Sequence, residues 1–191
     1  MSNVHSIQEQ MGFPPLQKVD ANTGDVKDQH QEGRQRLGQA AIPAALAIVA
    51  KYAASDKGLQ RLATGQVESN WLKEILGADR HNMIRQVAEY AGADPATAST
   101  TMQEAIQLAV HQGAHLTAEN ETSPAQQTFY ANLLTEALSY LPAAVPIGNA
   151  MNDDTLDDQT HKMEGPLSSL AHSIGNVFSD NRSEDPKDEK M

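Results

Sequence analysis

The chain of 191 residues is long enough for one domain with a hydrophobic core, and it carries 25 acidic and 14 basic side chains, a net charge of −11. This negative charge opposes contact with nucleic acid and with anionic membrane surfaces, so we expect neither as a partner. No cysteine is present, which excludes disulfides, thiolate metal sites and a cysteine nucleophile.

The composition favours an all-α fold. Aromatic residues supply only 4% of the chain, so alanine, leucine and isoleucine must fill the interior, which suits closely approaching helices. We expect a compact multihelical core at residues 38–146, preceded by a mobile arm and exposed helix at 1–37 and followed by an acidic tail at 147–191. No apolar run reaches the roughly 18 residues that span a bilayer, and the first residues lack a signal-peptide pattern, so we expect a cytoplasmic location.

The first 37 residues show little apolar periodicity. Residues 1–24 are polar and offer only Met11, Phe13 and Leu16 as a short apolar cluster that could dock on the core. Residues 25–37 are charged and rich in glutamine, which favours an exposed helix. From Gly38 the chain becomes strongly apolar, and Pro43 fits the first turn of a buried helix of about a dozen residues.

Two segments of the predicted core are related in sequence. The octet VAKYAASD at Val49–Asp56 returns 38 positions later as VAEYAGAD at Val87–Asp94. Each octet follows an apolar helical stripe and closes with an aspartate that can cap the next helix. The pattern predicts a duplicated unit of helix, tight turn and helix.

Capping residues mark further helix boundaries. Asn70 predicts the start of a short helix that Gly77 ends. Asp94–Pro95 predicts the start of a longer helix that ends at Gly113. Ser123–Gln126 has the residue types of a capping box and opens an amphipathic helix.

The last part of the chain is acidic. Residues 151–191 hold ten acidic and four basic side chains and so supply −6 of the net charge of −11. Between an acidic linker and a charged, disordered end, we predict one amphipathic helix. Its apolar face is the best candidate for contact with a partner and consists of Leu167, Leu170, Ile174, Val177 and Phe178.

No cluster of side chains indicates a particular reaction. His111 and His115 have the spacing at which two imidazoles on a helix can share a metal, but the intervening Gly113 favours a helix end. Residues 153–164 approach the spacing of a calcium loop, yet Asp158 stands where that loop requires glycine. Paired carboxylates fall in polar segments that cannot form a dry pocket. We therefore expect no catalytic, cofactor-binding or metal-binding residues, and solvated histidines at a helix end.

Tyr52 and Tyr90 occupy equivalent positions in the two octets. Two alternatives remain open for them: a ligand-stacking pair in a pocket between the copies, or two tyrosines with buried rings and solvated hydroxyls. Trp71 fits a core position better than a ligand site.

Residues Ala41–Leu59, with Pro43 and an Asp–x–Gly turn, and residues Ile75–Asp94 with the following helix resemble the bacterial YidB-like domain family. The resemblance covers about residues 38–112. It implies a multihelical domain, but it brings no activity, cofactor or catalytic residues, because that family is uncharacterised.

The leading hypothesis is a non-enzymatic interaction or scaffold protein that binds a protein partner, or a second copy of itself, through apolar helix faces. The alternative is a small-molecule or lipid-binding helical module with a pocket near Tyr52 and Tyr90. An enzyme is the third hypothesis, and it lacks a visible set of reacting side chains. Membrane binding by the tail helix is disfavoured by the negative charge around it.

Overall fold

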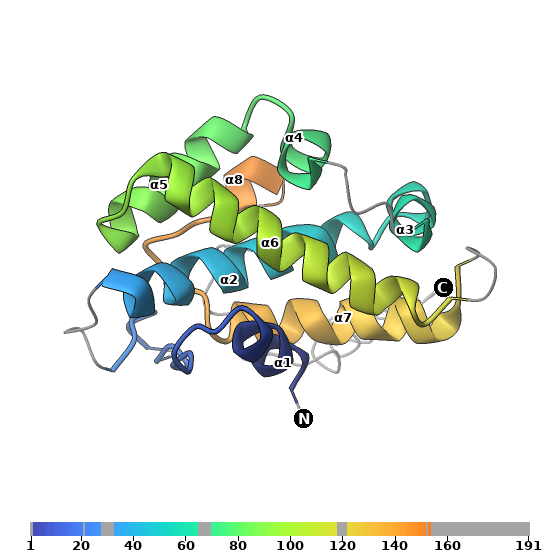
Figure 1. The fold of residues 1–191 in the computed structure, drawn as a ribbon, viewed down its shortest axis with the longest axis horizontal. Helices are drawn as coiled ribbons and strands as arrows, with labels where there is room; N and C mark the ends of the chain where they lie inside the picture. Colours follow the sequence, from blue (N-terminus) through green and yellow to red (C-terminus); the bar gives the residue numbers. More distant parts are fainter. Residues whose placement is uncertain are drawn as a thin grey trace, which may run out of the picture.

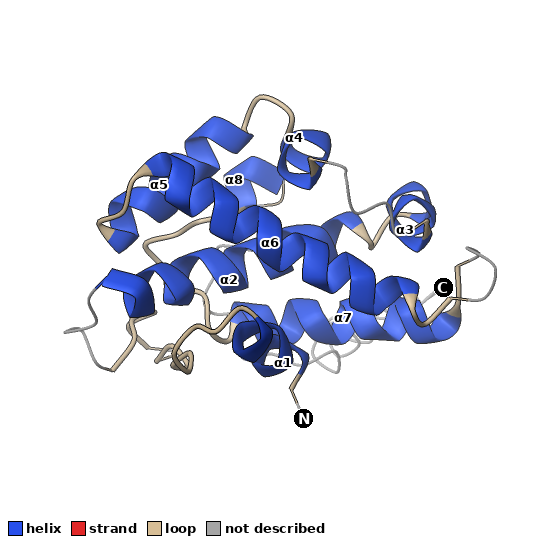
Figure 2. Ribbon diagram, viewed as in Figure 1, coloured by secondary structure: helices blue, strands red, loops and turns tan. Residues whose placement is uncertain are grey.

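The computed structural model describes residues 2–20, 22–27, 33–64, 70–117, 122–151 and 153. Within these ranges the chain forms helices and no β-strand, which confirms the expected all-α class (Figure 2). The helices are α1 (Asn3–Gln10), α2 (Gly33–Tyr52), α3 (Asp56–Ala63), α4 (Trp71–Leu76), α5 (Arg80–Ala91), α6 (Pro95–Ala114), α7 (Pro124–Leu138) and α8 (Gly148–Met151).

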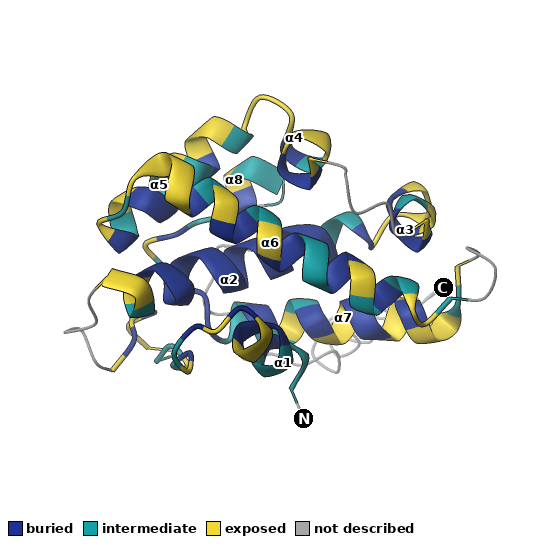
Figure 3. Cartoon of the chain, viewed as in Figure 1, coloured by how far each residue is buried: buried dark blue, intermediate teal, exposed yellow. Residues whose placement is uncertain are grey.

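Helix α2 runs through the middle of the molecule, between α7 on one side and α4 and α5 on the other, with α6 crossing it (Figure 1). Every residue from Leu37 to Ala50 is buried (Figure 3). Its broadest contacts are with α7 and α6, and α5 and α1 cover more of its surface. A helix that is buried all round needs protein on every side, so α2 organises the packing of the other helices.

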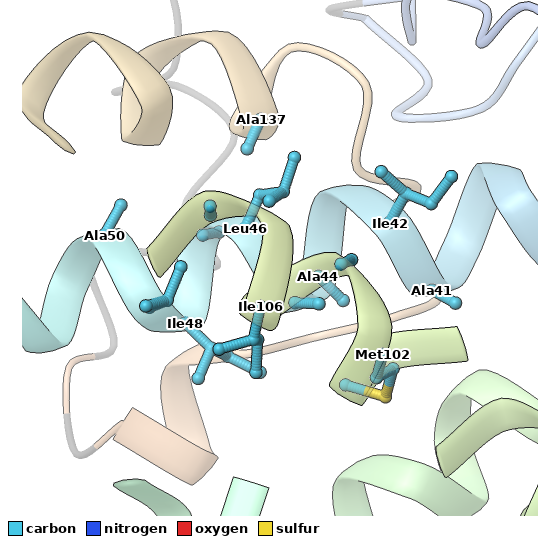
Figure 4. Close-up of a cluster of buried hydrophobic side chains, with 14 of the residues drawn as sticks. Ala41, Ile42, Ala44, Leu46, Ile48, Ala50, Met102, Ile106 and Ala137 are labelled. Carbon is cyan, nitrogen blue, oxygen red and sulfur yellow. The ribbon is translucent and has the colours of Figure 1, made fainter. Parts of the chain in front are cut away.

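Alanine allows the neighbouring helices to approach α2 closely. Figure 4 shows Ala41 and Ala44 of α2 near Met102 and Ile106 of α6, and Leu46 of α2 beside Ala137 of α7. Small side chains on one helix leave room for large ones from the next, so the interface fills without voids. As the composition predicts, alanine and larger aliphatic side chains supply most of the core.

Pro43 lies near the middle of α2, not in its first turn as expected, because the helix already begins at Gly33. A proline inside a helix removes the hydrogen bond to the carbonyl four residues earlier, here that of Gln39. Packing on all sides keeps this segment helical. The expected exposed helix at 25–37 is also wrong in its first part, because residues 25–27 form a bend and 33–37 are the first turns of α2.

The buried Gln39 side chain joins α2 to two other parts of the chain. Its amide nitrogen donates to the carbonyl oxygens of Gln17, at 2.9 Å, and Tyr140, at 2.6 Å. Its Oε1 accepts from the backbone N–H of Gln17 at 2.8 Å. A buried amide must be paired in this way, so Gln39 fixes where both segments lie.

Residues 2–20 do not form a mobile arm. Val4 and Ile7 of α1 are fully buried, and the cluster of Met11, Phe13 and Leu16 is docked on the core. The expectation failed because a helix of eight residues presents too few apolar positions to show a periodicity.

Polar contacts reinforce this docking. The Ser2 hydroxyl donates to the Glu136 carboxylate of α7 at 2.8 Å, and the backbone N–H of Val4 donates to the same oxygen at 3.2 Å. A carboxylate at the beginning of α1 also complements the positive end of the helix dipole.

Residues that follow α1 are held by residues that follow α7. The backbone N–H of Val19 donates to the carbonyl of Ser139 at 3.0 Å, and that of Ala143 donates to the carbonyl of Gly24 at 2.9 Å. Farther along, Ile147 is fully buried and α8 packs on α5. The core thus extends beyond the expected boundary at residue 146.

Three of the predicted helix starts are confirmed by their caps. The side chains of Asn70, Asp94 and Ser123 each accept a hydrogen bond from the backbone three residues later, at 2.9 to 3.0 Å. The predicted helix end at Gly77 is also confirmed, and α5 ends in the same way at Gly92; the φ angles of these glycines are positive, 55° and 64°.

Three other predictions of this kind are wrong. Ser55 rather than Asp56 caps α3, by accepting from the N–H of Gly58 at 3.0 Å. The Gln126 side chain is buried and, among the described residues, has no hydrogen-bond partner, so it does not complete a capping box. Helix α6 continues through Gly113 to Ala114.

The two related octets build unequal units. Helix α2 has 20 residues and α5 has 12, whereas α3 has 8 and α6 has 20. Helices α5 and α6 pack on each other, but α3 turns away from α2 by 112° and packs on α6. No single helix in the described ranges has the length and apolar composition of a membrane span, and α2 with α3 reaches them only when both are counted together across this bend.

We predict that Ile7→Ala lowers the free energy of unfolding by about 2–5 kcal/mol, because it empties a fully buried position between α1 and the core. Urea denaturation followed by far-UV circular dichroism measures the change. The matched control is Glu9→Ala on the exposed side of α1, for which we expect a change within about 0.5 kcal/mol. Equal effects of the two substitutions would show that α1 is not part of the core.

Candidate interaction site

A groove of about 330 Å³ opens where α3 turns away from the end of α2, with α7 forming its other wall. Its lining residues are mostly small or apolar: Ala50, Ala53, Ala54, Asp56, Leu59, Gln127, Tyr130, Ala131 and Leu134. Asp56 and Gln127 are exposed polar members. The groove therefore offers an apolar surface with a polar rim.

The local sequence explains why the groove is open. Helix α2 ends at Tyr52, and the cap at Ser55 starts α3 in a new direction, 112° from that of α2. The residues at this corner are Ala53 and Ala54, whose single methyl groups cannot fill the space between diverging helices. Larger apolar side chains here would close the groove and extend the core.

Tyr130 of α7 forms part of the groove wall and points its hydroxyl toward Gly113 of α6. The side chain is 2% exposed, and its hydroxyl has no hydrogen-bond partner among the described residues. Burial raises the pKa of Tyr130 above its ordinary value of 10.0, so the hydroxyl stays neutral. Gly113 is required here because a Cβ atom would lie 2.7 Å from Tyr130 Cζ.

Tyr52 and Tyr90 do not share a pocket. Tyr52 stands at the end of α2 in a separate hollow of about 580 Å³ that also contains Arg61 and Glu74. Tyr90 instead packs against Arg36, whose Cζ lies 5.0 Å from the tyrosine ring centroid, at the beginning of α2. The 16 positions from Arg36 to Tyr52 span about 24 Å of helix, so one ligand cannot stack between the two rings.

Two charged side chains of the Tyr52 hollow are paired with each other. The Arg61 guanidinium donates to both carboxylate oxygens of Glu74, at 2.6 and 3.0 Å. Burial is the main cause that raises the pKa of Tyr52, and the neighbouring Glu74 carboxylate raises it further. These features favour a neutral tyrosine beside a structural ion pair.

A third hollow, of about 480 Å³, lies at the opposite end of α2 and contains Arg34, Thr97, Thr101 and Glu104. The Arg34 guanidinium donates to the carbonyls of Met11 and Gly12, at 3.0 and 3.3 Å. The Thr101 hydroxyl donates to the carbonyl of Thr97 at 2.9 Å, within α6. The side chains of Arg34 and Thr101 are thus engaged in hydrogen bonds to the protein backbone.

The other predicted residues have different fates in the structure. Trp71 is fully buried, with the Arg61 guanidinium 4.8 Å from its ring centroid, so the core interpretation is confirmed. The apolar face at Leu167, Leu170, Ile174, Val177 and Phe178 lies outside the described residues. Of the calcium-loop segment 153–164 only Asp153 is described, and it forms an ion pair with Lys51. Within the described ranges, no three metal-ligating side chains come together.

The groove could not be predicted from the sequence because its alanines carry no distinctive pattern. Ala53 and Ala54 fit a tight turn equally well, and Ala131 lies off the apolar stripe of α7.

No known protein family, curated protein or solved structure matches the chain. The resemblance to the YidB-like domain therefore stays a prediction. The geometry of the groove and the chemistry of its lining are the basis for assigning a function.

We predict that Tyr130→Phe raises the free energy of unfolding at pH 7 by about 1 kcal/mol, because it removes a buried hydroxyl without a partner. Above about pH 10 the unfolded chain ionises at this tyrosine before the folded protein does. The wild type should then lose stability relative to the variant as the pH rises further. Urea denaturation of the wild type and the variant at pH 7 and above about pH 10 measures both effects. A lower stability of Tyr130→Phe than of the wild type at pH 7 would contradict the prediction.

Gly113→Ala tests the same contact from α6. A glycine-to-alanine change inside an exposed helix normally stabilises by about 1 kcal/mol. Here we expect the opposite sign, a loss of about 1–3 kcal/mol in the free energy of unfolding measured with urea, because the new methyl group overlaps the Tyr130 ring. A stabilising effect would show that Tyr130 does not occupy this position.

Proposed function

We propose that the chain is a non-enzymatic interaction protein that binds an apolar helix face of a protein partner, or of a second copy, in the groove between α2, α3 and α7. The observation that carries the proposal is the open, alanine-lined surface of this groove. Small side chains on a binding surface let the large side chains of an incoming helix reach close to the backbone.

The chemistry of the lining supports a helix face over a small polar ligand. Sites for small molecules use a few precisely placed polar groups to fix orientation, and these are usually buried. The Tyr130 hydroxyl points away toward Gly113, and the other polar side chains of the lining, Asp56 and Gln127, are exposed at its rim. An amphipathic partner helix, with an apolar stripe flanked by polar residues, would match this apolar groove and its polar rim.

The alternative function, a ligand pocket between Tyr52 and Tyr90, loses its structural basis because the two rings lie at opposite ends of α2. Catalysis is not part of the proposal. In the two larger hollows the side chains of Arg34, Arg61, Glu74 and Thr101 are engaged in hydrogen bonds within the protein, which gives no support to a catalytic role for them.

The proposal keeps two elements that rest on sequence. One is membership of a YidB-like group of helical domains, with a cytoplasmic location. The other is the apolar face that includes Leu170, Ile174 and Phe178, as a second surface for the partner. Deletion of residues 163–191 separates its contribution from that of the groove.

We predict that Ala131→Arg weakens partner binding by on the order of tenfold or more, because an unpaired guanidinium would be buried in an apolar interface. Ala131 is exposed in the free protein, so the substitution should leave thermal unfolding unchanged. The measurement is quantitative affinity purification from the native host, repeated with the recombinant partner by calorimetry, and light scattering for self-association.

The matched control is Asn132→Arg, the same new side chain on the adjacent, exposed position of α7 that does not line the groove. We expect this variant to bind like the wild type. Equal binding by the wild type and both variants would contradict the groove as the interaction site. Equal loss in both would indicate a general effect of charge.

A further inference from the structure

The last turn of α6 brings His111 and His115 together. Their Nε2 atoms lie 3.2 Å apart, and their rings meet edge to face with centroids separated by 4.4 Å. Both side chains are exposed, so neither is held in place by burial in the core. This pair does not line the groove, so a role for it is independent of the proposed function.

The backbone that carries the pair is fixed. Helix α6 continues through Gly113 because this glycine packs against Tyr130, and the N–H of His115 donates to the carbonyl of His111 at 3.2 Å. Glycine as a residue type favours a helix end, but here Gly113 lies within α6, and His111 and His115 therefore project from the same side of the helix. The Cβ atoms of residues four apart on one helix face lie about 5–6 Å from each other, so the two imidazoles stay within reach of one another.

This separation fits a chelated metal ion. Two nitrogen ligands at about 2.0–2.1 Å from a tetrahedral ion stand about 3.3–3.4 Å apart. The observed 3.2 Å between the two Nε2 atoms is within easy adjustment of that distance by rotation of the exposed rings. We propose that His111 and His115 form a bidentate site for a divalent transition ion of the zinc, nickel or copper class.

The ligand set determines which ions fit. Imidazole nitrogen suits zinc, nickel and copper, whereas magnesium and calcium require oxygen ligands. Among the described residues no third histidine or carboxylate joins the pair, so the two imidazoles are the ligands that the proposal names. In the metal-bound form each ring presents its Nε2 lone pair to the ion and carries its proton on Nδ1. The ion then replaces the direct contact between the two Nε2 atoms.

Electrostatics favours a cation at this place. His115 is the C-cap of α6, where the negative end of the helix dipole lies. The chain as a whole carries a net charge of −11, which attracts cations from solution. A bound ion would also link two successive turns and so oppose fraying of the end of α6.

The test is calorimetric titration of the full chain, purified without a histidine tag, with zinc chloride and with nickel chloride. We expect one site in the wild type. His111→Gln and His115→Gln should each weaken it by on the order of tenfold or more, because the second ligand otherwise binds intramolecularly. The matched control, His81→Gln at an exposed position of α5, should bind like the wild type.

A second measurement reports on structure and not only on affinity. Saturating zinc should raise the thermal unfolding temperature of the wild type and of His81→Gln, and this shift should be lost in both His111→Gln and His115→Gln. Wild-type binding by either of these two variants would overturn the proposal. So would an absence of binding by the wild type, or an equal loss of binding in His81→Gln.

Discussion

The complete burial of α2 is the constraint on which the rest of the fold depends. A helix without a solvent-facing side must be covered all round, and no single pair of helices can provide that cover. Helices α7, α6, α5 and α1 together surround it, at distances that its alanines permit. Gln39 lies within this buried stretch, and it meets its hydrogen-bonding needs through backbone groups of Gln17 and Tyr140. Helix α2 is thus buried without leaving the side-chain amide of Gln39 short of hydrogen-bond partners.

The groove results from the same constraint. The alanines that let neighbouring helices approach α2 continue through the buried Ala53 to the exposed Ala54, at the corner where α3 leaves at 112°. At Ala54 no helix of the described ranges covers the chain, although the residue is still an alanine. A residue type suited to close packing between helices therefore also lies on an open surface at this corner, which is the physical basis for proposing an interaction site here.

Features set by neighbouring residues could be predicted from sequence, and features set by distant contacts could not. Caps such as Asn70 and Asp94–Pro95 act within one turn, so their chemistry is visible in the chain itself. The role of Gly113 depends on Tyr130, a residue of another helix, whereas its residue type alone indicates a helix end. The same limit explains why the docking of α1 was not predicted, because its few apolar residues are buried only by contacts with distant parts of the chain. It also explains why Tyr52 and Tyr90, although equivalent in the two octets, do not line one pocket.

The hydrogen bonds between Val19 and Ser139 and between Gly24 and Ala143 join positions about 120 residues apart in the chain. During synthesis, the segment that follows α1 emerges from the ribosome long before its binding surface exists. At roughly 5–20 residues per second, the interval between completion of α2 and translation of Ala143 lasts about 5–20 s. Throughout that time α2 lacks the cover that α7 provides, so one side of this otherwise buried helix stays exposed until the last part of the core has been made.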